Sequence, residues 1–486
     1  MKEYDTHSLD VPYLDRLDEE GLDAIHEGAM HIIEEIGIKL NHDRALDLFE
    51  EAGAEVDREE SMVKIPRDIV EDAVDKAPSQ FTLHGRDPDK KVTIGPTADG
   101  QIRAPGYGAP NVRTFEDGRR GSQLSDYKDL IKICHQEDVI NSTGYNVCEP
   151  NDVDQEVKHY EMIEQSLKLS DMPVMGSVYG EDRAQASLDM VSIAVDDDDL
   201  SKPYMAGLIN TVPPRSIDTK MLGGLMKYAE HGQPVLVSSF TMAGASAPAT
   251  LAGAFTLANA ENLTGITLAQ LVNEGAPVVY GIPASNIDVR YGSLSIGSPE
   301  SALFVSFAGQ MGRYYGVPSR GGGGLSDAKS IDYQGGFESM LVQAATQFAD
   351  IDYVLHSAGI LESYSVISPE KLVLDCEIMR YLDRYKEGFE VNEENLALDV
   401  IPEVEAAGHF LSERHTLMHS KDELFKSELV DKRSHGDWEE DGSKSAFEMG
   451  YDRVQEDIAD YEQPELDSDL QQDLENYVEE GKKGAY

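Results

Sequence analysis

The chain has 486 residues, of which 40% are hydrophobic, so it is long and apolar enough to bury a large core. It carries 91 Asp and Glu against 41 Lys and Arg, which gives a formal net charge of -50. A surface of this sign repels nucleic acids and anionic membranes, so we expect neither as a partner.

The acidic residues are spread along the whole chain, as residues 196–199, 439–441 and 465–480 illustrate. Dispersed acid around a normally apolar interior is typical of proteins from a high-salt cytoplasm, where ions screen self-repulsion over a Debye length of about 3 Å at 1 M. We therefore expect a halophilic protein of haloarchaeal type. An acidic protein that docks a basic partner is the alternative.

Cysteine content and hydropathy predict a cytoplasmic location. The chain has only three cysteines, Cys134, Cys148 and Cys376, so no disulfide framework is implied. The N-terminus lacks the apolar core of a signal peptide. Residues 250–266 come closest to a membrane span, but Asn259, Glu261 and Asn262 interrupt them.

Residues 1–95 are polar and rich in helical patterns. Apolar residues from Leu22 to Ile36 recur at helical spacing, Asp43 can cap a second helix, and Pro66 opens a third. We predict an N-terminal helical segment that serves as a scaffold or cap and carries no chemistry.

Residues 96–400 alternate short apolar runs with amphipathic helical stretches, about eight times. Strands separated by helices predict a parallel sheet, and this count and length fit a TIM (β/α)8 barrel of the α/β class. A doubly wound open sheet is the alternative, although no GxGxxG motif follows the first strand. The expected strands are residues 101–104, 139–145, 173–178, 204–208, 234–239, 277–281, 318–321 and 353–357.

Residues 401–486 are charged and carry helical patterns. We predict an acidic C-terminal helical extension that packs on the barrel or on a neighbouring subunit.

Four consecutive glycines, Gly321–Gly324, follow the expected seventh strand and precede Asp327 and Lys329. Because glycine costs backbone entropy, a folded chain keeps such a run where it bends sharply or where a ligand approaches the backbone. Glycines and charged residues at a strand end are typical of the active face of a barrel. A tight turn without a function is the alternative.

Aromatic and polar side chains follow most of the expected strands. The carboxyl ends of barrel strands meet at one mouth, so these residues are expected to surround one cavity. Aromatic faces hold alkylated ammonium groups by cation–π attraction, worth about 0.5–2 kcal/mol each. Half-buried packing is the alternative for any single tyrosine. The set is Tyr107, Tyr145, Asn146, Tyr179, Asn210, Phe240, Met242, Ser285, Asn286, Asp327, Lys329 and His356.

Other common catalytic motifs are missing from the sequence. The glycine run lacks the Gly-Lys-Ser/Thr ending of a P-loop, and no nucleophile elbow stands between a strand and a helix. No convincing pair of carboxylates at strand ends supports a barrel hydrolase. We also expect no directly bound metal, since no set of ligands has the required spacing.

An ordered series of segments resembles the trimethylamine methyltransferase family of corrinoid-dependent methyltransferases. The resemblance extends over nearly the whole chain. The segments are IIEEIGI (32–38), AGAEVD (52–57), AGASAPATLAG (243–253), AQLVN (269–273), GAPVVYG (275–281), IGSPE (296–300), RYYGVPSRGGGG (313–324) and SDAK (326–329).

The resemblance implies a TIM barrel that transfers a methyl group from a methylated amine to the cobalt of a corrinoid, which a separate protein carries. Some family members act on trimethylamine and contain pyrrolysine, whereas this sequence shows only standard residues. The expected substrate is therefore a quaternary amine similar to glycine betaine. Two alternatives remain: a trimethylamine or other tertiary-amine methyltransferase, and a non-catalytic barrel that binds or senses betaine. The resemblance also implies a homo-oligomer.

Roles follow for the residues at the strand ends. Tyr107, Tyr145 and Tyr280 are expected to wall the cationic head group, and Asn146 or Asn210 to fix polar substrate atoms. His356 is the expected catalytic contact near the substrate or the cobalt. Arg320 or the backbone of Gly321, Gly322, Gly323 and Gly324 is expected to receive a substrate carboxylate or the corrinoid edge. Asp327 is assigned to the corrinoid-binding set, with a structural ion pair as the alternative.

Overall fold

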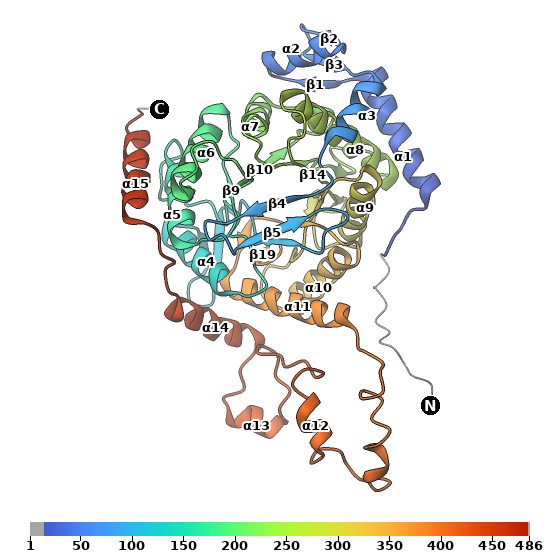
Figure 1. Cartoon of the computed structure of the whole chain (residues 1–486), viewed down its shortest axis with the longest axis vertical. Helices are drawn as coiled ribbons and strands as arrows, with labels where there is room; N and C mark the ends of the chain where they lie inside the picture. The colour runs from blue at the N-terminus through green and yellow to red at the C-terminus, as the bar shows by residue number, and fades with distance from the viewer. Residues whose placement is uncertain (1–13, 485–486) are drawn as a thin grey trace.

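The computed structural model describes residues 14–484 and contains a parallel sheet of seven strands that curls around a central axis (Figure 1). The strands follow the order β6-β18-β17-β14-β12-β10-β9, and every neighbouring pair is parallel. All seven coincide with expected strands. Their bounds are β6 Ile102–Ala104, β9 Val174–Gly176, β10 Met205–Asn210, β12 Val235–Ser238, β14 Val278–Gly281, β17 Ser319–Gly321 and β18 Tyr353–Leu355.

An irregular segment, residues 141–146, fills the gap between β6 and β9 and closes the barrel. The Asn141 N–H donates to the Arg103 carbonyl of β6, and the Met175 N–H of β9 donates to the Gly144 carbonyl at 3.0 Å. The Asn141 side chain replaces one backbone partner by accepting from the Arg103 N–H at 2.8 Å. Residues 139–145, expected as a strand, thus form no regular strand, but they lie between β6 and β9 as predicted, and the open-sheet alternative is wrong.

One helix follows each barrel position, so the chain alternates strand and helix eight times around the ring (Figure 1). Ser298 and Ser368 cap α9 and α11, and each is followed by a proline at the first helical position, where its missing N–H is not needed. The helices are α4 Leu124–Gln136, α5 Lys158–Leu169, α6 Glu181–Val195, α7 Thr219–Glu230, α8 Leu251–Val272, α9 Pro299–Tyr315, α10 Tyr333–Phe348 and α11 Pro369–Glu387.

The N-terminal segment contains the three expected helices and also strands that the sequence analysis missed. Helices α1 and α3 pack on α8. Strands β1, β2 and β3 form a small sheet, and β11, which follows β10 in the chain, joins its edge by pairing with β1. The elements are α1 Glu19–His31, the π-helical turn Ile32–Ile36, β1 Ile38–Leu40, α2 Asp43–Ala52, β2 Glu55–Asp57, β3 Met62–Lys64, α3 Arg67–Lys76 and β11 Ser216–Ile217.

A hairpin of β4 (Phe81–His84) and β5 (Lys91–Ile94) closes the amino-terminal end of the barrel and crosses it in Figure 1. Leu83 and Ile94 are fully buried. The Gly95 N–H donates to the carboxylate of Asp352, which also accepts from the N–H of Ser319 at the start of β17. The opposite end, where the strands finish, is therefore the mouth.

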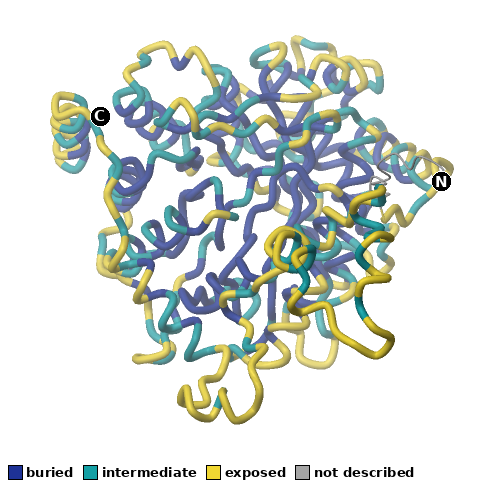
Figure 2. Tube along the Cα trace, turned by 60° about the horizontal axis from the view of Figure 1, so that its bottom comes forward, coloured by how far each residue is buried: buried dark blue, intermediate teal, exposed yellow. Residues whose placement is uncertain are grey.

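The C-terminal extension is helical only in part. Residues 388–434 are mostly exposed and irregular (Figure 2), apart from the turn Ile401–Glu403 and α12 Arg414–His419. The prediction that residues 401–486 are helical is thus wrong for most of residues 401–434. After α13 (His435–Glu440), α14 (Ala446–Asp460) packs on α11 and α4, and α15 (Ser468–Lys482) packs on α5 and α6. These two helices bear out the expectation that the extension packs on the barrel.

Two small sheets formed by the loops after the barrel strands surround the mouth. One has the order β19-β20-β7-β8 and the other β13-β15-β16. Their bounds are β7 Asn111–Thr114, β8 Gly118–Gly121, β19 Ile360–Leu361, β20 Val366–Ile367, β13 Met242–Ala243, β15 Ser285–Asp288 and β16 Ser293–Ser295.

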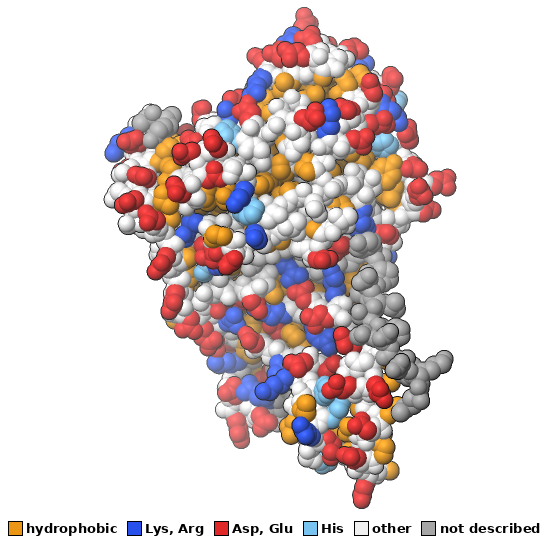
Figure 3. All heavy atoms as spheres, in the orientation of Figure 1, with side chains coloured by type: hydrophobic (Ala, Val, Ile, Leu, Met, Phe, Trp, Pro, Cys, Tyr) orange, Lys and Arg blue, Asp and Glu red, His pale blue; other side chains and the backbone are white. Residues whose placement is uncertain are grey.

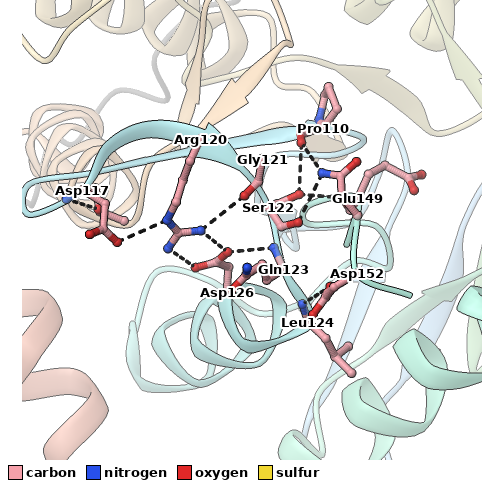
Figure 4. A network of polar contacts seen from close by, with 12 residues as sticks. Pro110, Asp117, Arg120, Gly121, Ser122, Gln123, Leu124, Asp126, Glu149 and Asp152 are labelled. Atoms are coloured by element: carbon pink, nitrogen blue, oxygen red, sulfur yellow. Dashed lines mark hydrogen bonds and ion pairs between the residues drawn. The ribbon is translucent and has the colours of Figure 1, made fainter. Parts of the chain in front are cut away.

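A polar network anchors the β7–β8 hairpin to the start of α4 (Figure 4). Arg120 donates to both carboxylate oxygens of Asp126 at 2.7 and 2.8 Å, and Asp126 also accepts from the Gln123 N–H at 2.8 Å. The Ser122 hydroxyl donates to the carbonyls of Pro110 and Glu149. These bonds fix one side of the rim of the mouth.

Replacing Asp126 by Ala should lower the free energy of unfolding by about 1–2 kcal/mol, since it removes a bidentate ion pair and half of a capping box. Asp47→Ala, which breaks an exposed contact with Arg58, should cost only about 0–1 kcal/mol. Denaturant unfolding of both variants measures the difference. Equal losses would contradict the role given to Asp126.

Candidate functional site

A cavity in two lobes lies at the barrel mouth, and Tyr107, Leu208 and Asn210 line both lobes. The first, which we call the arginine lobe, has a volume of about 290 Å³ and is lined by Tyr107, Leu208, Asn210, Thr211, Phe240, Pro283, Arg320, His356 and Tyr364. The second, the lysine lobe, measures about 300 Å³ and includes Tyr145, Asn146, Glu149, Lys158, His159 and Tyr179.

Arg320 projects from β17 into the barrel and is only 1% exposed. Its Nη2 lies 3.2 Å from Nδ1 of His356, whereas its Nε and Nη1 have no protein partner. Among residues 14–484, no carboxylate forms an ion pair with Arg320. Burial lowers its pKa to about 10, so the guanidinium stays charged at neutral pH. A buried cation without a counter-ion is costly, and this one is a ready site for an anion.

Gly281 of β14 leaves the space that the Arg320 side chain occupies. A Cβ atom at this position would lie 3.1 Å from Cδ of Arg320 and 2.6 Å from the Ser238 hydroxyl. Any larger residue would push the guanidinium out of place, so the glycine is required by close approach.

His356 orients the guanidinium and is itself neutral. Its Nδ1 accepts from Arg320, which leaves the proton on Nε2 to donate to the Tyr107 carbonyl at 3.3 Å. Burial and the neighbouring Arg320 lower its pKa to about 3, so His356 does not exchange protons near neutral pH. Its backbone is left-handed, with φ of 67°, a conformation that costs roughly 1–3 kcal/mol and is concentrated at functional sites.

Neutral aromatic rings wall the arginine lobe. The Tyr364 ring lies 4.8 Å from that of His356 and 5.9 Å from that of Phe240, and the Tyr107 ring lies 6.4 Å from that of Tyr145. Burial raises the pKa of Tyr364 to about 12 and raises those of Tyr107 and Tyr145 further, so the phenols stay protonated. Such rings offer π faces to a cation without adding a negative charge.

The lysine lobe is polar and opens to solvent. Lys158 is buried and pairs with Glu149 at 3.1 Å, and Asn146 donates to the same carboxylate. Burial lowers the pKa of His159 to about 4. Asn210 is exposed at the end of β10, and Tyr179 on the rim is 50% exposed.

Tyr280 does not line the cavity, which corrects its predicted role at the head group. Its hydroxyl donates to Oδ1 of Asn259 on α8, and the Asn259 amide donates to the hydroxyl of Tyr315 on α9, both at 2.8 Å. Successive side chains of a strand point to opposite faces, so Tyr280 faces the outer helices while Gly281 faces the barrel.

None of Gly321, Gly322, Gly323 and Gly324 lines either lobe, so their predicted contact with a ligand is not supported. A Cβ on Gly324 would lie 2.5 Å from the Asp375 carboxylate and 2.6 Å from the Ser357 carbonyl. The Gly324 N–H donates to the carbonyl of His356 at 2.9 Å. The glycines allow the loop to pack tightly beneath His356.

Asp327 is also absent from the cavity lining, although it was assigned to the corrinoid-binding set. Its carboxylate accepts hydrogen bonds from Ser295, Ile296, Gly297 and Ser363. These four bonds occupy the carboxylate and join loops that surround the mouth.

The family model described as trimethylamine methyltransferase (MTTB) matches residues 2–485. The chain belongs to this family. It is 40% identical over 470 residues to a glycine betaine methyltransferase of Desulfitobacterium hafniense. The aligned region covers 96% of this chain and 97% of that protein. It is 30% identical to a trimethylamine methyltransferase of Methanosarcina mazei, over 95% and 94% of the two chains. It is 29% identical to a proline betaine:corrinoid methyltransferase of Eubacterium limosum, over 95% and 96%.

In this family member, the cavity brings together eight of the residues predicted from the sequence: Tyr107, Tyr145, Asn146, Tyr179, Asn210, Phe240, Arg320 and His356. Their roles remain predictions. Within residues 14–484, no group of three or more His, Cys, Asp or Glu is arranged to hold a metal ion, and no helix has the length and apolar character of a membrane span.

Sequence reasoning missed Tyr364 in the arginine lobe. It lies in the turn between β19 and β20, where Glu362, Ser363 and Tyr364 all have positive φ, of 50°, 53° and 71°. The segment contains neither glycine nor an alternating apolar pattern, so nothing in the sequence marks it as part of a site. Each left-handed residue costs roughly 1–2 kcal/mol, so contacts elsewhere must hold the turn.

Replacing His356 by Gln should make stability less sensitive to acid. Between about pH 6.5 and 3, His356 binds a proton in the unfolded chain but not in the folded protein. The free energy of unfolding therefore falls as the pH is lowered below 6.5, by up to about 1.4 kcal/mol per pH unit. Denaturant unfolding at several pH values should show a shallower decline for the variant. Curves for His356→Gln and wild type that run parallel would contradict the assignment.

Proposed function

We propose that this protein transfers a methyl group from a betaine-like quaternary amine, with glycine betaine as the expected substrate, to the Co(I) corrinoid of a separate corrinoid protein. The observation that carries the proposal is the buried guanidinium of Arg320, which lacks a carboxylate partner at the bottom of an aromatic cavity. The similarity to relatives named for glycine betaine and proline betaine supports the same substrate class.

The arginine lobe matches both ends of such a substrate. The carboxylate would accept from N–H groups of Arg320 that have no protein partner, and charge-assisted bonds of this kind are the strong ones. The quaternary ammonium would then lie among the rings of Tyr107, Phe240 and Tyr364, with its methyl groups toward the mouth. Anchoring the carboxylate deep in the barrel thus orients the methyl groups toward the opening.

The reaction needs little acid–base chemistry from the protein. When the C–N bond breaks, its electron pair stays on nitrogen, and the leaving group is a neutral tertiary amine. The corrinoid supplies a Co(I) nucleophile that accepts the methyl group. The chain's own residues hold the substrate in line and exclude water, and the neutral His356 fits this requirement.

The mouth offers room for a corrinoid to approach. Asn210 is exposed and Tyr179 is half exposed at the rim, and the lysine lobe extends the opening. An exposed polar side chain such as Asn210 suits the amide-rich edge of a corrinoid. We assign the rim to this role in the proposed reaction.

Trimethylamine fits the site less well than a betaine. Its ammonium form has no carboxylate, so it would leave Arg320 unpaired and add a second cation beside it. Two cations held side by side in a cavity that excludes water repel each other strongly. The tertiary-amine alternative is therefore disfavoured by the same residue that favours betaine.

Replacing Arg320 by Met should lower kcat/KM for glycine betaine by roughly 10- to 100-fold, which corresponds to about 1.5–3 kcal/mol for hydrogen bonds to a charged group. The assay follows loss of the Co(I) absorbance of a reduced corrinoid after addition of glycine betaine, choline or trimethylamine. Wild type should prefer glycine betaine to choline, which lacks a carboxylate, and the variant should lose this preference.

The stability of the variant provides the control. Because Met removes a buried unpaired charge, Arg320→Met should unfold at the same or a higher temperature than wild type. A folded variant that keeps its preference for glycine betaine would refute the role of Arg320. Wild type that neither binds nor demethylates any compound would refute the proposed reaction, and binding without turnover would support a sensing barrel.

We infer that the protein forms a homo-oligomer through helix α10. Tyr333, Phe337, Met340 and Leu341 follow one another at helical spacing, and they are 87%, 49%, 37% and 38% exposed. The one charged residue of α10 is Glu338, which is buried. Two copies that each carry a charge of -50 can approach with least repulsion on such a face.

Sedimentation in about 2 M KCl, where charge is screened, tests this surface. Phe337→Glu should shift the protein toward the 53.5 kDa monomer, whereas Val289→Glu, at an exposed apolar residue on the β15–β16 turn, should not. A wild-type protein that sediments as a monomer at micromolar concentration would contradict the inference.

We propose that the enzyme works in a high-salt cytoplasm. Asp and Glu side chains are spread over the whole face seen in Figure 3. The three cysteines are unpaired and buried, which is compatible with a reducing compartment.

A further inference from the structure

The β19–β20 turn places the Tyr364 ring in the arginine lobe. Tyr364 contacts His356 and Phe240 there, at ring distances of 4.8 and 5.9 Å. Glu362, Ser363 and Tyr364 are three successive left-handed residues without a glycine. A turn of this kind does not keep its shape by itself, so the position of the ring depends on the contacts that hold the turn.

Asp327 provides the shortest side-chain contact to this turn, which is also held by an ion pair between Glu362 and Arg119 at 3.0 Å. The Ser363 hydroxyl, next to Tyr364 in sequence, lies 2.6 Å from Oδ1 of Asp327, and 3.1 Å from the Leu294 carbonyl. The Ser363 N–H also donates to the carbonyl of Ser326, the residue before Asp327, and the Glu362 N–H donates to that of Ala328, the residue after it. The turn is thus attached to the 326–328 segment on both sides.

The same carboxylate holds a third loop. Asp327 accepts from the backbone N–H groups of Ile296 and Gly297, both at 3.0 Å, and from the Ser295 hydroxyl at 3.3 Å. Ser295 ends β16, and the segment leads into α9. One carboxylate therefore ties together the loops that follow three consecutive barrel strands, β14, β17 and β18.

Asp327 is itself held in one orientation. Its N–H donates to Glu338 of α10 at 2.8 Å, and the same Glu338 oxygen accepts from the Ser326 hydroxyl at 2.7 Å. Because every bond is made by a short side chain or the backbone, a small displacement of the Asp327 carboxylate moves the β19–β20 turn with it. The arrangement connects the outer helix α10 to the ring in the cavity.

We propose that Asp327 is a positioning residue for substrate binding, which fixes the Tyr364 ring against the quaternary ammonium through Ser363. This inference rests on the proposed function, since it concerns the same substrate. It assigns to Asp327 an indirect role in place of contact with the corrinoid, and it makes Tyr364 the aromatic residue through which that role acts.

A double-mutant cycle tests the coupling. Binding of glycine betaine to the full-length protein is measured by calorimetry in high salt without corrinoid, for wild type, Asp327→Ala, Tyr364→Ala and the double variant. Each single change should raise the Kd roughly tenfold. The double variant should also show about a tenfold increase instead of a hundredfold one, because Asp327 acts through Tyr364. Ser363→Ala, which removes the bond through which Asp327 acts on the turn, should raise the Kd by a similar factor.

Asp332→Ala is the matched control. Asp332 lies five residues further along, where it caps α10 by accepting from Gln334 and Gly335, and it makes no contact with the turn. This variant should lose stability without a change in the Kd. Hydrogen exchange of the amides of residues 362–365 should accelerate in Asp327→Ala and remain slow in Asp332→Ala.

The outcomes separate the inference from the proposed function. Wild type that binds glycine betaine, together with effects of Asp327→Ala and Tyr364→Ala that multiply in the double variant, would overturn the inference alone. Unchanged exchange at residues 362–365 in Asp327→Ala would also overturn it. Wild type that binds no methylated amine would overturn both.

Discussion

The contact between Arg320 and His356 is the interaction around which the mouth of the barrel is arranged. It places a desolvated guanidinium, 1% exposed, where two of its N–H-bearing nitrogens have no protein partner. Gly281 leaves room for the side chain, the Tyr107 carbonyl fixes the tautomer of His356, and the glycine run packs beneath the His356 backbone. Each of these features would serve no purpose if the guanidinium were simply exposed to water. A buried ion carries a penalty of several kcal/mol, which an anionic ligand can offset.

The side chains around the charged Arg320 guanidinium are themselves uncharged. A protonated His356 would place a second cation 3.2 Å from the guanidinium, and burial prevents this by lowering its pKa. Tyr107, Tyr145 and Tyr364 keep their protons for the same reason. The lobe thus offers a single fixed charge at its base and uncharged π surfaces above it, a distribution that matches a zwitterion with its anion inward. The position of this charge along the barrel axis would contribute more to substrate selectivity than the shape of the cavity.

The fold could be predicted because strand–helix alternation is a property of local sequence. Seven of the eight predicted strands were found, and an irregular segment takes the place of the other. Arg320 and His356 could be found because barrel geometry collects residues at strand ends. Tyr280 was misplaced because a strand buried on both faces carries no apolar–polar alternation to tell the inner face from the outer. The strands of the N-terminal segment were missed because several carry charged residues, such as Glu55, Asp57, Lys64 and Lys91, in place of the apolar runs that marked the barrel strands. Tyr364 reaches the cavity through a turn whose shape is imposed by residues distant in sequence, and only tertiary structure reveals that.

The β4–β5 hairpin that seals the amino-terminal end of the barrel has a consequence for the order of events. With Leu83 and Ile94 packed into that end, small molecules reach Arg320 through the mouth. A corrinoid protein seated there would cover the same route. In the proposed reaction the amine must therefore bind before the protein partner, and the demethylated product must wait until that partner departs. Such an enzyme would follow a compulsory-order kinetic scheme, in which excess corrinoid protein inhibits turnover by trapping the empty barrel.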